Sequence, residues 1–264
     1  MLNILVCVKQ VPDVNLVKID PVTGSLIRKG VPAILNPLDA NAVEAAVRVK
    51  EQYGGTVTCI TMGPDFAMEA LRECLAAGAD KAVLLSDRAF ANADTLATSY
   101  VIVSAAKLLG DFDLIFCGKE SLDGATGQMG SQLAERFDAS QISSMSLITE
   151  IDEQNKTVTA ERELEKGIEI CQAQYPCLFT VEKTNYRPRI PNLASWKASR
   201  KAEIVKFDSK TIPGLDPEQI GDPGSPTKVP RTYPPVTGEA GIILDEGSVE
   251  KNVAKLAGLL TEVL

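Results

Sequence analysis

Along the first 140 residues, short apolar runs alternate with segments in which apolar residues recur every three or four positions. The short runs scarcely alternate with polar residues, which is typical of strands buried on both faces; they cover residues 2–8, 57–62, 81–85 and 114–117. The longer segments predict helices at residues 39–52, 65–77, 94–109 and 128–137. Because strands that alternate with helices need crossover connections, the pattern predicts an α/β fold with a doubly wound, mostly parallel sheet.

Beyond residue 140 the pattern changes. Further strands are predicted at residues 157–160, 168–171 and 177–181, after a polar interruption at 150–153. We expect them to be antiparallel strands added to the sheet or a small second layer. Residues 186–236 hold nine of the fifteen prolines, a density that predicts an extended arm without regular structure.

A final helix is predicted at residues 248–264, with Ser248 as its N-cap. Its apolar face is formed by Val249, Val253, Leu256 and Leu260. We therefore expect two parts, an α/β domain at residues 1–200 and a C-terminal arm with a helix at 201–264. The arm and helix could pack on their own domain or on a partner subunit; because the preceding domain is complete without them, we favour the partner.

Charge and composition narrow the possible functions. The chain has 264 residues, a net charge of −8 and no histidine, which excludes catalysis by Ser-His or Cys-His pairs and imidazole metal ligands. An acidic chain without a basic face is not expected to bind nucleic acid or a membrane. None of the six cysteines forms a C-x-x-C pair, and the N-terminus has no signal-peptide pattern. We expect a reduced, cytoplasmic protein.

The segment at residues 117–130 follows a predicted strand and opens a predicted helix. Ligands of parallel sheets bind at the carboxyl ends of strands, and free N–H groups at a helix start favour phosphate. The segment reads C-G-K-E-S-L-D-G-A-T-G-Q-M-G, which is neither a P-loop nor G-x-G-x-x-G. It predicts either a phosphate-binding loop, with Thr126 and Gln128 as donors, or an ordinary tight turn.

Two other loops follow or precede predicted elements in the same way. Residues 36–39 read N-P-L-D, so that Pro37 starts a helix and Asn36 offers an amide for a base edge or a ribose, or serves only as a cap. Residues 8–13 read V-K-Q-V-P-D and place Lys9 directly after the first strand, where it binds a ligand or only faces solvent.

With these loops in place, the chain resembles the β subunits of electron-transfer flavoproteins, closest to the electron-bifurcating group that uses two FAD and NADH. The resemblance covers residues 6 to about 201. It rests on V-C-V-K-Q-V-P-D at 6–13, N-P at 36–37 ahead of A-V-E at 42–44, M-G-P at 62–64, G-A-D at 78–80, the loop at 118–130, A-E-R-E at 160–163, Pro176, Thr180, and P-R at 188–189 before Leu193. Lys166 departs from the family pattern after the A-E-R-E strand.

The resemblance implies a Rossmann-like nucleotide-binding domain whose C-terminal arm embraces an α subunit. Bifurcating members resemble D-G-x-T-x-Q-x-G in the phosphate loop, as residues 123–130 do here, whereas simple carriers have aspartates and an asparagine and hold AMP. The resemblance therefore implies FAD, with NADH as the substrate. The positions that it implies for the cofactor are Cys7, Asn36, Pro37, Leu38, Asp39, Met62, Gly118, Lys119, Asp123, Gly124, Ala125, Thr126, Gly127, Gln128, Met129 and Gly130.

The same resemblance implies that Leu193 docks onto a client enzyme, an acyl-CoA or 2-hydroxyacid dehydrogenase, and that ferredoxin is a second acceptor. No side chain is an obvious acid, base or nucleophile, and hydride transfer is flavin chemistry, so whether the chain is itself an enzyme stays open. A simple electron carrier that holds AMP, and an ATP-using protein of similar fold, are the alternatives.

Overall fold

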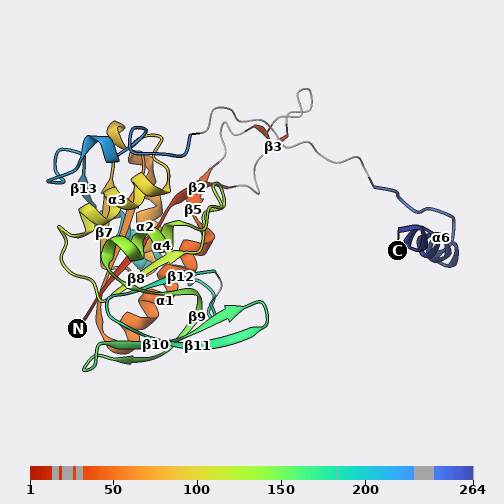
Figure 1. The fold of residues 1–264 in the computed structure, drawn as a ribbon, viewed down its shortest axis with the longest axis horizontal. Coiled ribbons are helices and arrows are strands. Elements are labelled where there is room, and N and C mark those ends of the chain that lie inside the picture. Colours follow the sequence, from red (N-terminus) through yellow and green to blue (C-terminus); the bar gives the residue numbers. More distant parts are fainter. Residues whose placement is uncertain (14–17, 20–25, 28–31, 183, 229–240, 264) are drawn as a thin grey trace. The chain divides into compact units, whose positions relative to one another are not determined.

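A computed structural model describes residues 1–13, 18–19, 26–27, 32–182, 184–228 and 241–263. Their contacts divide the chain into two units, Met1–Pro230 and Arg231–Leu264. The first unit contains a nine-stranded sheet with the strand order β11-β10-β9-β12-β8-β1-β6-β7-β13 (Figure 1). It is a mixed sheet whose larger part is parallel, which confirms the predicted α/β fold class.

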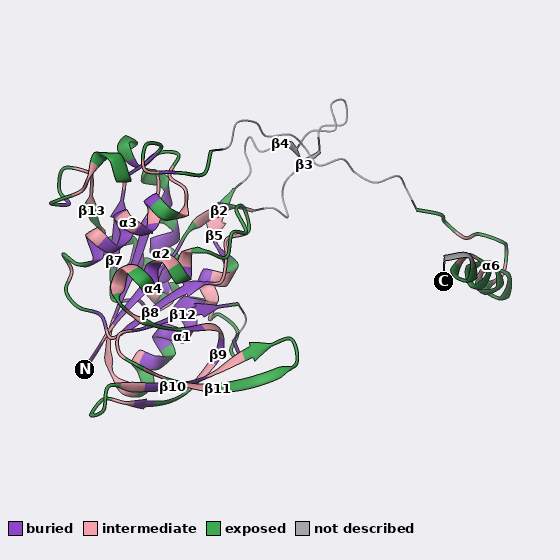
Figure 2. Cartoon of the chain, in the orientation of Figure 1, coloured by how far each residue is buried: buried purple, intermediate pink, exposed green. Residues whose placement is uncertain are grey.

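Five of the strands with parallel neighbours coincide with the predicted apolar runs. They are β1 (Leu2–Cys7), β6 (Gly55–Met62), β7 (Lys81–Leu85), β8 (Leu114–Gly118) and β12 (Cys177–Val181). Along β1, Ile4 and Val6 belong to one hydrophobic core while Leu5 and Cys7 belong to another. This is why the strand shows no polar alternation: both of its faces are covered, as the purple interior of Figure 2 shows.

Each face of the sheet carries its own pair of helices. The first core includes residues of α1 (Pro37–Tyr53) and α2 (Met68–Ala76), and the second includes residues of α3 (Thr95–Ala106) and α4 (Met129–Phe137). The short 3-10 helices η2 (Asp65–Ala67) and η3 (Arg88–Phe90) follow β6 and β7. The helices of the doubly wound part were therefore predicted correctly, within a few residues at each end.

The second half of the sheet corrects one prediction and extends another. Strand β9 (Ser140–Asp152) runs through residues that we expected to be a polar interruption, and it pairs antiparallel with β10 (Thr157–Leu164), as β10 does with β11 (Gly167–Gln174). In contrast, β12 pairs parallel with both β8 and β9, so our expectation that residues 177–181 are antiparallel was wrong. All five residues of β12 are buried, as in a central strand.

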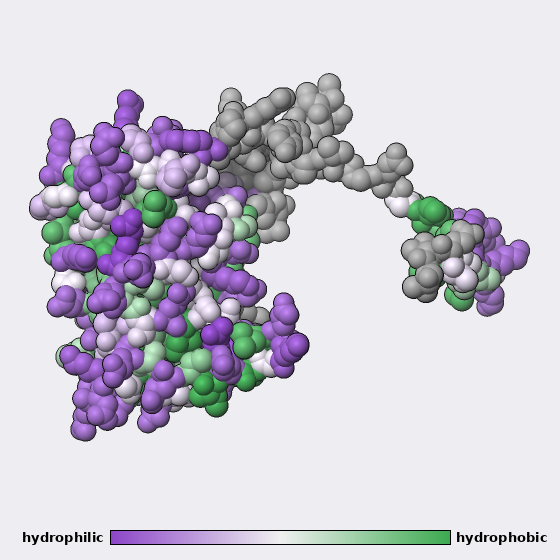
Figure 3. Space-filling model, viewed as in Figure 1, coloured by the Kyte–Doolittle hydropathy of each residue, from purple (hydrophilic) through white to green (hydrophobic). Residues whose placement is uncertain are grey.

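The edge strand β11 exposes apolar side chains. Ile168 and Ile170 are largely exposed, and hydrophobic residues lie on the surface around β10 and β11 (Figure 3). Two short ladders lie outside the main sheet: β2 (Gln10–Pro12) pairs with β5 (Ala33–Leu35), and β3 (Lys18–Ile19) pairs with β4 (Leu26–Ile27).

The proline-rich region is more regular than we expected. It contains α5 (Leu193–Lys201), β13 (Val205–Phe207) beside β7, and the 3-10 helix η4 (Pro217–Gln219). The high average proline density of this region does not apply to residues 192–212, which contain no proline and can therefore form a helix and a strand. Ile212 and Ile220 are buried in the second core, which places these residues with the α/β unit rather than in an arm that starts at residue 201.

The second unit contains α6 (Val249–Val263), where we predicted the last helix. Lys251 N donates to Ser248 Oγ (3.4 Å), so Ser248 caps the helix as expected. Val249, Val253, Leu256 and Leu260 are each exposed. No helix among the described residues is both long and apolar enough to cross a bilayer.

Candidate functional site

The order of the strands defines where a ligand site is expected. From β1 the chain builds β6 and β7 on one side, and it then crosses back to place β8 on the other side of β1. The connections after β1 and β8 therefore leave in opposite directions, which opens a crevice at the carboxyl ends of these two strands. The loop after β1 contains Lys9, and the loop after β8 contains residues 119–128.

Asp39, in the first turn of α1, joins the two sides of this crevice. Its Oδ2 accepts from Lys9 N (2.7 Å) and its Oδ1 accepts from Gly118 N (2.9 Å). A Cβ atom at residue 118 would overlap Asp39 Oδ1, so only glycine allows this approach. Burial raises the pKa of the Asp39 carboxyl to about 7, against the opposing effect of the two N–H donors. Asp39 therefore links Lys9, in the loop that follows β1, to the end of β8 by two hydrogen bonds.

Asn36 fixes the first part of the loop after β8. Its buried side chain donates from Nδ2 to Glu120 O (2.9 Å), and its Oδ1 accepts from Leu122 N (3.2 Å). Both ends of the amide are thus engaged within the protein. From the sequence, we expected this amide either to contact a base edge or a ribose or to cap α1; in the structure it makes no capping hydrogen bond and binds the loop instead.

The tip of the loop after β8 is exposed, and the loop takes part in two ion pairs. Lys9 Nζ lies 2.7 and 2.9 Å from the two carboxylate oxygens of Asp123, and Lys119 Nζ lies 2.7 Å from Glu182 Oε2. Partial burial acts to raise the pKa of Asp123, but the hydrogen bonds from Lys9 and Ser121 outweigh it, and the pKa lies below its usual value. The charge of Asp123 is therefore balanced locally, which reduces its repulsion of a phosphate.

Glycine is suited to each of these loop positions for a different physical reason. A Cβ atom at Gly130 would overlap Thr180 Cγ2, so this glycine lets α4 pack closely on β12. Gly127 has φ +63°, which favours glycine, and a Cβ atom there would meet nothing within 4 Å. At Gly124 a Cβ atom would meet only Ser121 Oγ, at 3.3 Å. The space beside Gly124 and Gly127 is therefore open to a ligand.

The start of α4 supplies backbone donors to the same place. Gln128 precedes the helix and its side chain makes no capping hydrogen bond, whereas Asp94 caps α3 by accepting from Ala97 N (3.1 Å). Among the residues that the structure describes, no side chain accepts from the first N–H groups of α4, which carry the positive end of the helix dipole. Such donors suit an anionic group such as a phosphate.

The remaining positions implied by the family resemblance lie at the same end of the sheet. Cys7 and Cys117 are neighbours in register at the ends of β1 and β8, and burial raises the pKa of both thiols. Met62 ends β6, and Pro37 and Leu38 begin α1. The structure therefore brings together strands and helix starts that the sequence placed more than a hundred residues apart.

A second group of residues lies along α1, beyond the crevice. Arg189 Nε lies 2.8 Å from Glu44 Oε2, and Arg189 Nη1 lies 2.6 Å from Glu51 Oε1. This pairing holds the segment that leads into α5, where Ile190 is 94% exposed and Leu193, the first residue of α5, is 67% exposed. We predicted Leu193 as a docking residue, and the nearby Ile190 is even more exposed.

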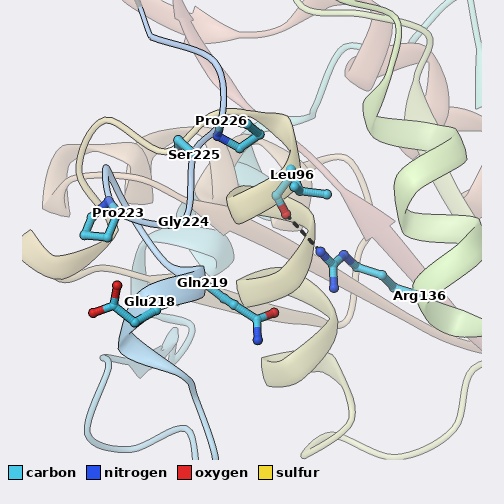
Figure 4. Close-up of a pocket in the computed structure, with 8 residues that line it drawn as sticks. All are labelled: Leu96, Arg136, Glu218, Gln219, Pro223, Gly224, Ser225 and Pro226. Atoms are coloured by element: carbon cyan, nitrogen blue, oxygen red, sulfur yellow. Dashed lines mark hydrogen bonds between the residues drawn. The ribbon is translucent and has the colours of Figure 1, made fainter.

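A hollow of about 250 Å³ lies elsewhere, between the starts of α3 and η4 (Figure 4). Arg136 borders it, but its guanidinium donates to Ser99 Oγ (3.0 Å) and to Leu96 O (3.3 Å) and lies over the ring of Tyr100. Its charge is therefore directed at α3 rather than into the hollow. Within the described parts of the chain, no group of Cys, Asp or Glu side chains is arranged to hold a metal ion.

Comparison with known proteins gives consistent matches over nearly the whole chain. The model of the electron transfer flavoprotein domain matches residues 23–212. The electron transfer flavoprotein subunit beta of Thermoanaerobacterium thermosaccharolyticum is 44% identical over 256 residues, which cover 97% of this chain and 96% of that protein. Subunit CarD of the caffeyl-CoA reductase-Etf complex of Acetobacterium woodii is 42% identical, with 99% and 98% covered. Protein FixA of Azotobacter vinelandii is 41% identical, with 98% and 94% covered.

Proposed function

Because the chain belongs to the electron transfer flavoprotein family and matches its β subunits along almost its full length, we propose that it is the FAD-binding β subunit of a bifurcating flavoprotein. In this proposal it accepts hydride from NADH. The electrons divide between ferredoxin and, through the FAD of an α subunit, an acyl-CoA or 2-hydroxyacid dehydrogenase. The similarity to CarD, a subunit of a caffeyl-CoA reductase-Etf complex, supports a client of the acyl-CoA type.

The observation that carries the FAD assignment is the open loop between β8 and α4. Its space beside Gly124 and Gly127 borders the start of α4, whose first N–H groups have no side-chain cap. The carboxylate nearest to this space, Asp123, is paired with Lys9. A pyrophosphate on this loop would meet backbone donors, the hydroxyl of Thr126 and the amide of Gln128, without an unbalanced negative charge.

The residues of the chain then divide into two roles. Asp39 and Asn36 hold the backbone of the crevice, because their polar atoms are engaged with Lys9, Gly118, Glu120 and Leu122. Residues 124–130 would contact the pyrophosphate, and the ends of β1 and β6 would border the adenosine. The bound FAD would supply the redox chemistry, and the protein would supply orientation and the local charge.

An AMP-holding electron carrier is the alternative, since AMP would place one phosphate on the same loop. The two are distinguished by the nucleotides that the co-expressed αβ heterodimer releases on denaturation, separated by chromatography and quantified by absorbance. We expect about two FAD and no AMP per heterodimer. One FAD with one AMP would contradict the bifurcating function and support the simple carrier.

The client dehydrogenase would dock on the segment at residues 187–193. Ile190 and Leu193 project from a segment that Arg189 fixes to α1 and that two prolines stiffen. A preordered apolar anchor loses little conformational entropy on binding, which makes it suited to a short-lived electron-transfer contact.

Electron transfer flavoprotein β subunits pair with an α subunit, and we propose that α6 takes part in this pairing. Its exposed residues Val249, Val253, Leu256 and Leu260 are spaced so that they share one face of the helix. Covering such a face removes apolar surface from water, which favours association.

A further inference from the structure

Two hydrogen bonds among the side chains of three residues connect the first turn of α3 to the start of α4. Thr95, the first residue of α3, donates from Oγ1 to Gln128 Oε1 (2.9 Å). Gln132, on the first turn of α4, donates from Nε2 to the same Thr95 oxygen (3.1 Å). From the sequence, Gln128 was expected at the ligand, whereas Thr95, which lies 33 residues earlier in the chain, was not.

The hydroxyl of Thr95 decides which groups donate and which accept in these two hydrogen bonds. A hydroxyl has a single proton, so if it accepts from Gln132 it has one proton to donate, and that proton goes to the carbonyl oxygen of Gln128. The amide of Gln128 therefore turns its oxygen toward α3 and leaves its NH2 group on the other side. In the described parts of the structure, this NH2 group has no hydrogen-bond partner, and the residue is exposed.

If the donors and acceptors were reversed, the loop would present a different group of Gln128 to a ligand. If Gln128 donated to Thr95 and Thr95 donated to Gln132, Gln128 would present a carbonyl oxygen, which repels a phosphate. In the observed direction, the buried Oε1 of Gln132 is left without a partner instead. A bound anion would stabilise the observed direction, because it accepts from the NH2 group of Gln128 beside the uncapped N–H groups of α4.

We propose that Thr95 is a positioning residue that makes Gln128 an anion donor, and that the phosphate preference of the loop depends on it. This rests on the proposed function, in so far as a nucleotide phosphate lies at residues 123–130. Thr95 itself does not need to touch the nucleotide. Its effect falls on the phosphate and not on the adenosine, because Gln128 lies at the loop and not at the ends of β1 and β6.

The test uses the αβ heterodimer freed of nucleotide, with ADP and adenosine as probes in isothermal titration calorimetry. Thr95→Val keeps the shape of the side chain and removes the hydrogen bonds, whereas Thr95→Ser keeps the hydroxyl. Thr149→Val is the matched control, since Thr149 is an exposed threonine on β9 that donates only to Thr159 O. The melting temperature of each heterodimer is measured in parallel.

We expect Thr95→Val to weaken ADP binding roughly tenfold, the effect of one lost hydrogen bond to an anion, with adenosine binding unchanged. Thr95→Ser and Thr149→Val should bind ADP like the wild type. Equal ADP affinity in Thr95→Val, an equal loss for ADP and adenosine, or no rescue by serine would each overturn the proposal. If wild-type heterodimer releases AMP rather than FAD while these ADP effects are found, the flavin assignment fails and the role of Thr95 stands. If the wild type binds neither probe, both fail.

Discussion

Arg189 lies with its Nε 2.8 Å from Oε2 of Glu44, a carboxylate that is only 2% exposed on α1. The backbone N–H of Arg189 donates to the same oxygen (3.0 Å), and Arg48 pairs with the other oxygen (2.6 Å). Burial acts to raise the pKa of Glu44, but these hydrogen bonds outweigh it and hold the pKa below its usual value. One helix therefore positions the crevice through Asp39 and the exposed segment at residues 187–193 through Glu44.

Arg189→Ala should destabilise the protein, because it leaves the buried Glu44 carboxylate with fewer partners. We expect a loss of about 2 kcal/mol, less than for a pair broken completely because Arg48 remains. For a domain of this size this corresponds to a melting temperature lower by about 4–8 °C. Arg200→Ala is the control, since Arg200 and Glu69 are both about half exposed and such pairs contribute little. Equal melting temperatures for the two variants would contradict the anchoring role of Glu44.

Gly124→Asp should abolish nucleotide retention. The substitution places a side chain and a second negative charge in the open space beside the start of α4, where no lysine is left to balance it among the described residues of the loop. Gly124→Ala tests the charge separately, since its Cβ atom would meet only Ser121 Oγ at 3.3 Å. We expect the alanine variant to keep most of its nucleotide. The aspartate variant should lose more than about 90% of it, because repulsion between the new carboxylate and the phosphate weakens binding by about 1.4 kcal/mol or more. Full nucleotide content in the aspartate variant would place the phosphate elsewhere.

Ile190→Ala and Leu193→Ala should slow electron transfer to the client without changing nucleotide content. Truncation of an apolar anchor at the centre of an interface typically costs more than about 1 kcal/mol, or roughly a fivefold increase in KM for the dehydrogenase. The measurement is steady-state reduction kinetics with the acyl-CoA or 2-hydroxyacid dehydrogenase that co-purifies with the heterodimer. Leu108→Ala, a half-exposed leucine just after α3, is the control on the other face of the sheet. Unchanged kinetics in both variants would exclude docking at this segment.

The pKa of Asp39 predicts a pH dependence of stability. Its pKa of about 7 in the folded chain lies above the value of 3.8 expected for an unperturbed carboxyl. Because the folded state binds this proton more tightly than the unfolded state, the contribution of Asp39 is greatest at low pH and is lost as the pH rises from about 4 to 7. Asp39→Asn cannot titrate.

Comparing the melting temperatures of the two proteins isolates this group. The difference, wild type minus Asp39→Asn, should decrease between pH 5 and pH 8. A constant difference would show that Asp39 does not titrate in this range. The variant also replaces one acceptor with a donor opposite Lys9 N or Gly118 N, so we expect weaker nucleotide retention at every pH.

The C-terminal helix can be tested by truncation. Deletion of residues 245–264 removes the apolar face formed by Val249, Val253, Leu256 and Leu260, and we expect less α subunit to co-purify. The full-length chain expressed alone should aggregate, because this face then remains in water. Replacing Lys251 and Lys255 with alanine is the control, since it leaves the apolar face intact. Normal co-purification after truncation, or a stable monomer of the chain alone, would contradict the role of α6.

The sequence was most informative where periodicity reflects burial. Strands β1, β6, β7 and β8 are buried on both faces, so their apolar runs were sufficient to place them and their crossover helices. The direction of β12 could not be predicted, because an apolar run of five residues has the same pattern in a parallel and an antiparallel ladder. The long strand β9 was missed, since most of its residues are exposed or only partly buried and several are polar.

At the candidate site, the sequence indicated the backbone segments that meet at the crevice but not every side-chain contact. A glycine-rich turn and an N-P-L-D helix start are local features, and they lie at the crevice. The partners of Asn36 are 84 and 86 residues away, and the partner of Glu44 is 145 residues away. Such hydrogen bonds depend on the tertiary structure, so the sequence alone could not show that Asn36 and Asp39 support the crevice from within.

The crevice also has a consequence for the order in which the protein is built. Strand β1 must pair with β8, and Asn3 N donates to Asp113 Oδ2 across 110 residues of chain. Contacts so distant in sequence form slowly, because a large loop must close before they contribute. During synthesis, β1 therefore cannot pair with β8 until β8 has left the ribosome, so the proposed nucleotide could not bind before that point. A nucleotide that binds only after β1 has paired with β8 would stabilise the chains whose central sheet is complete, late in their synthesis.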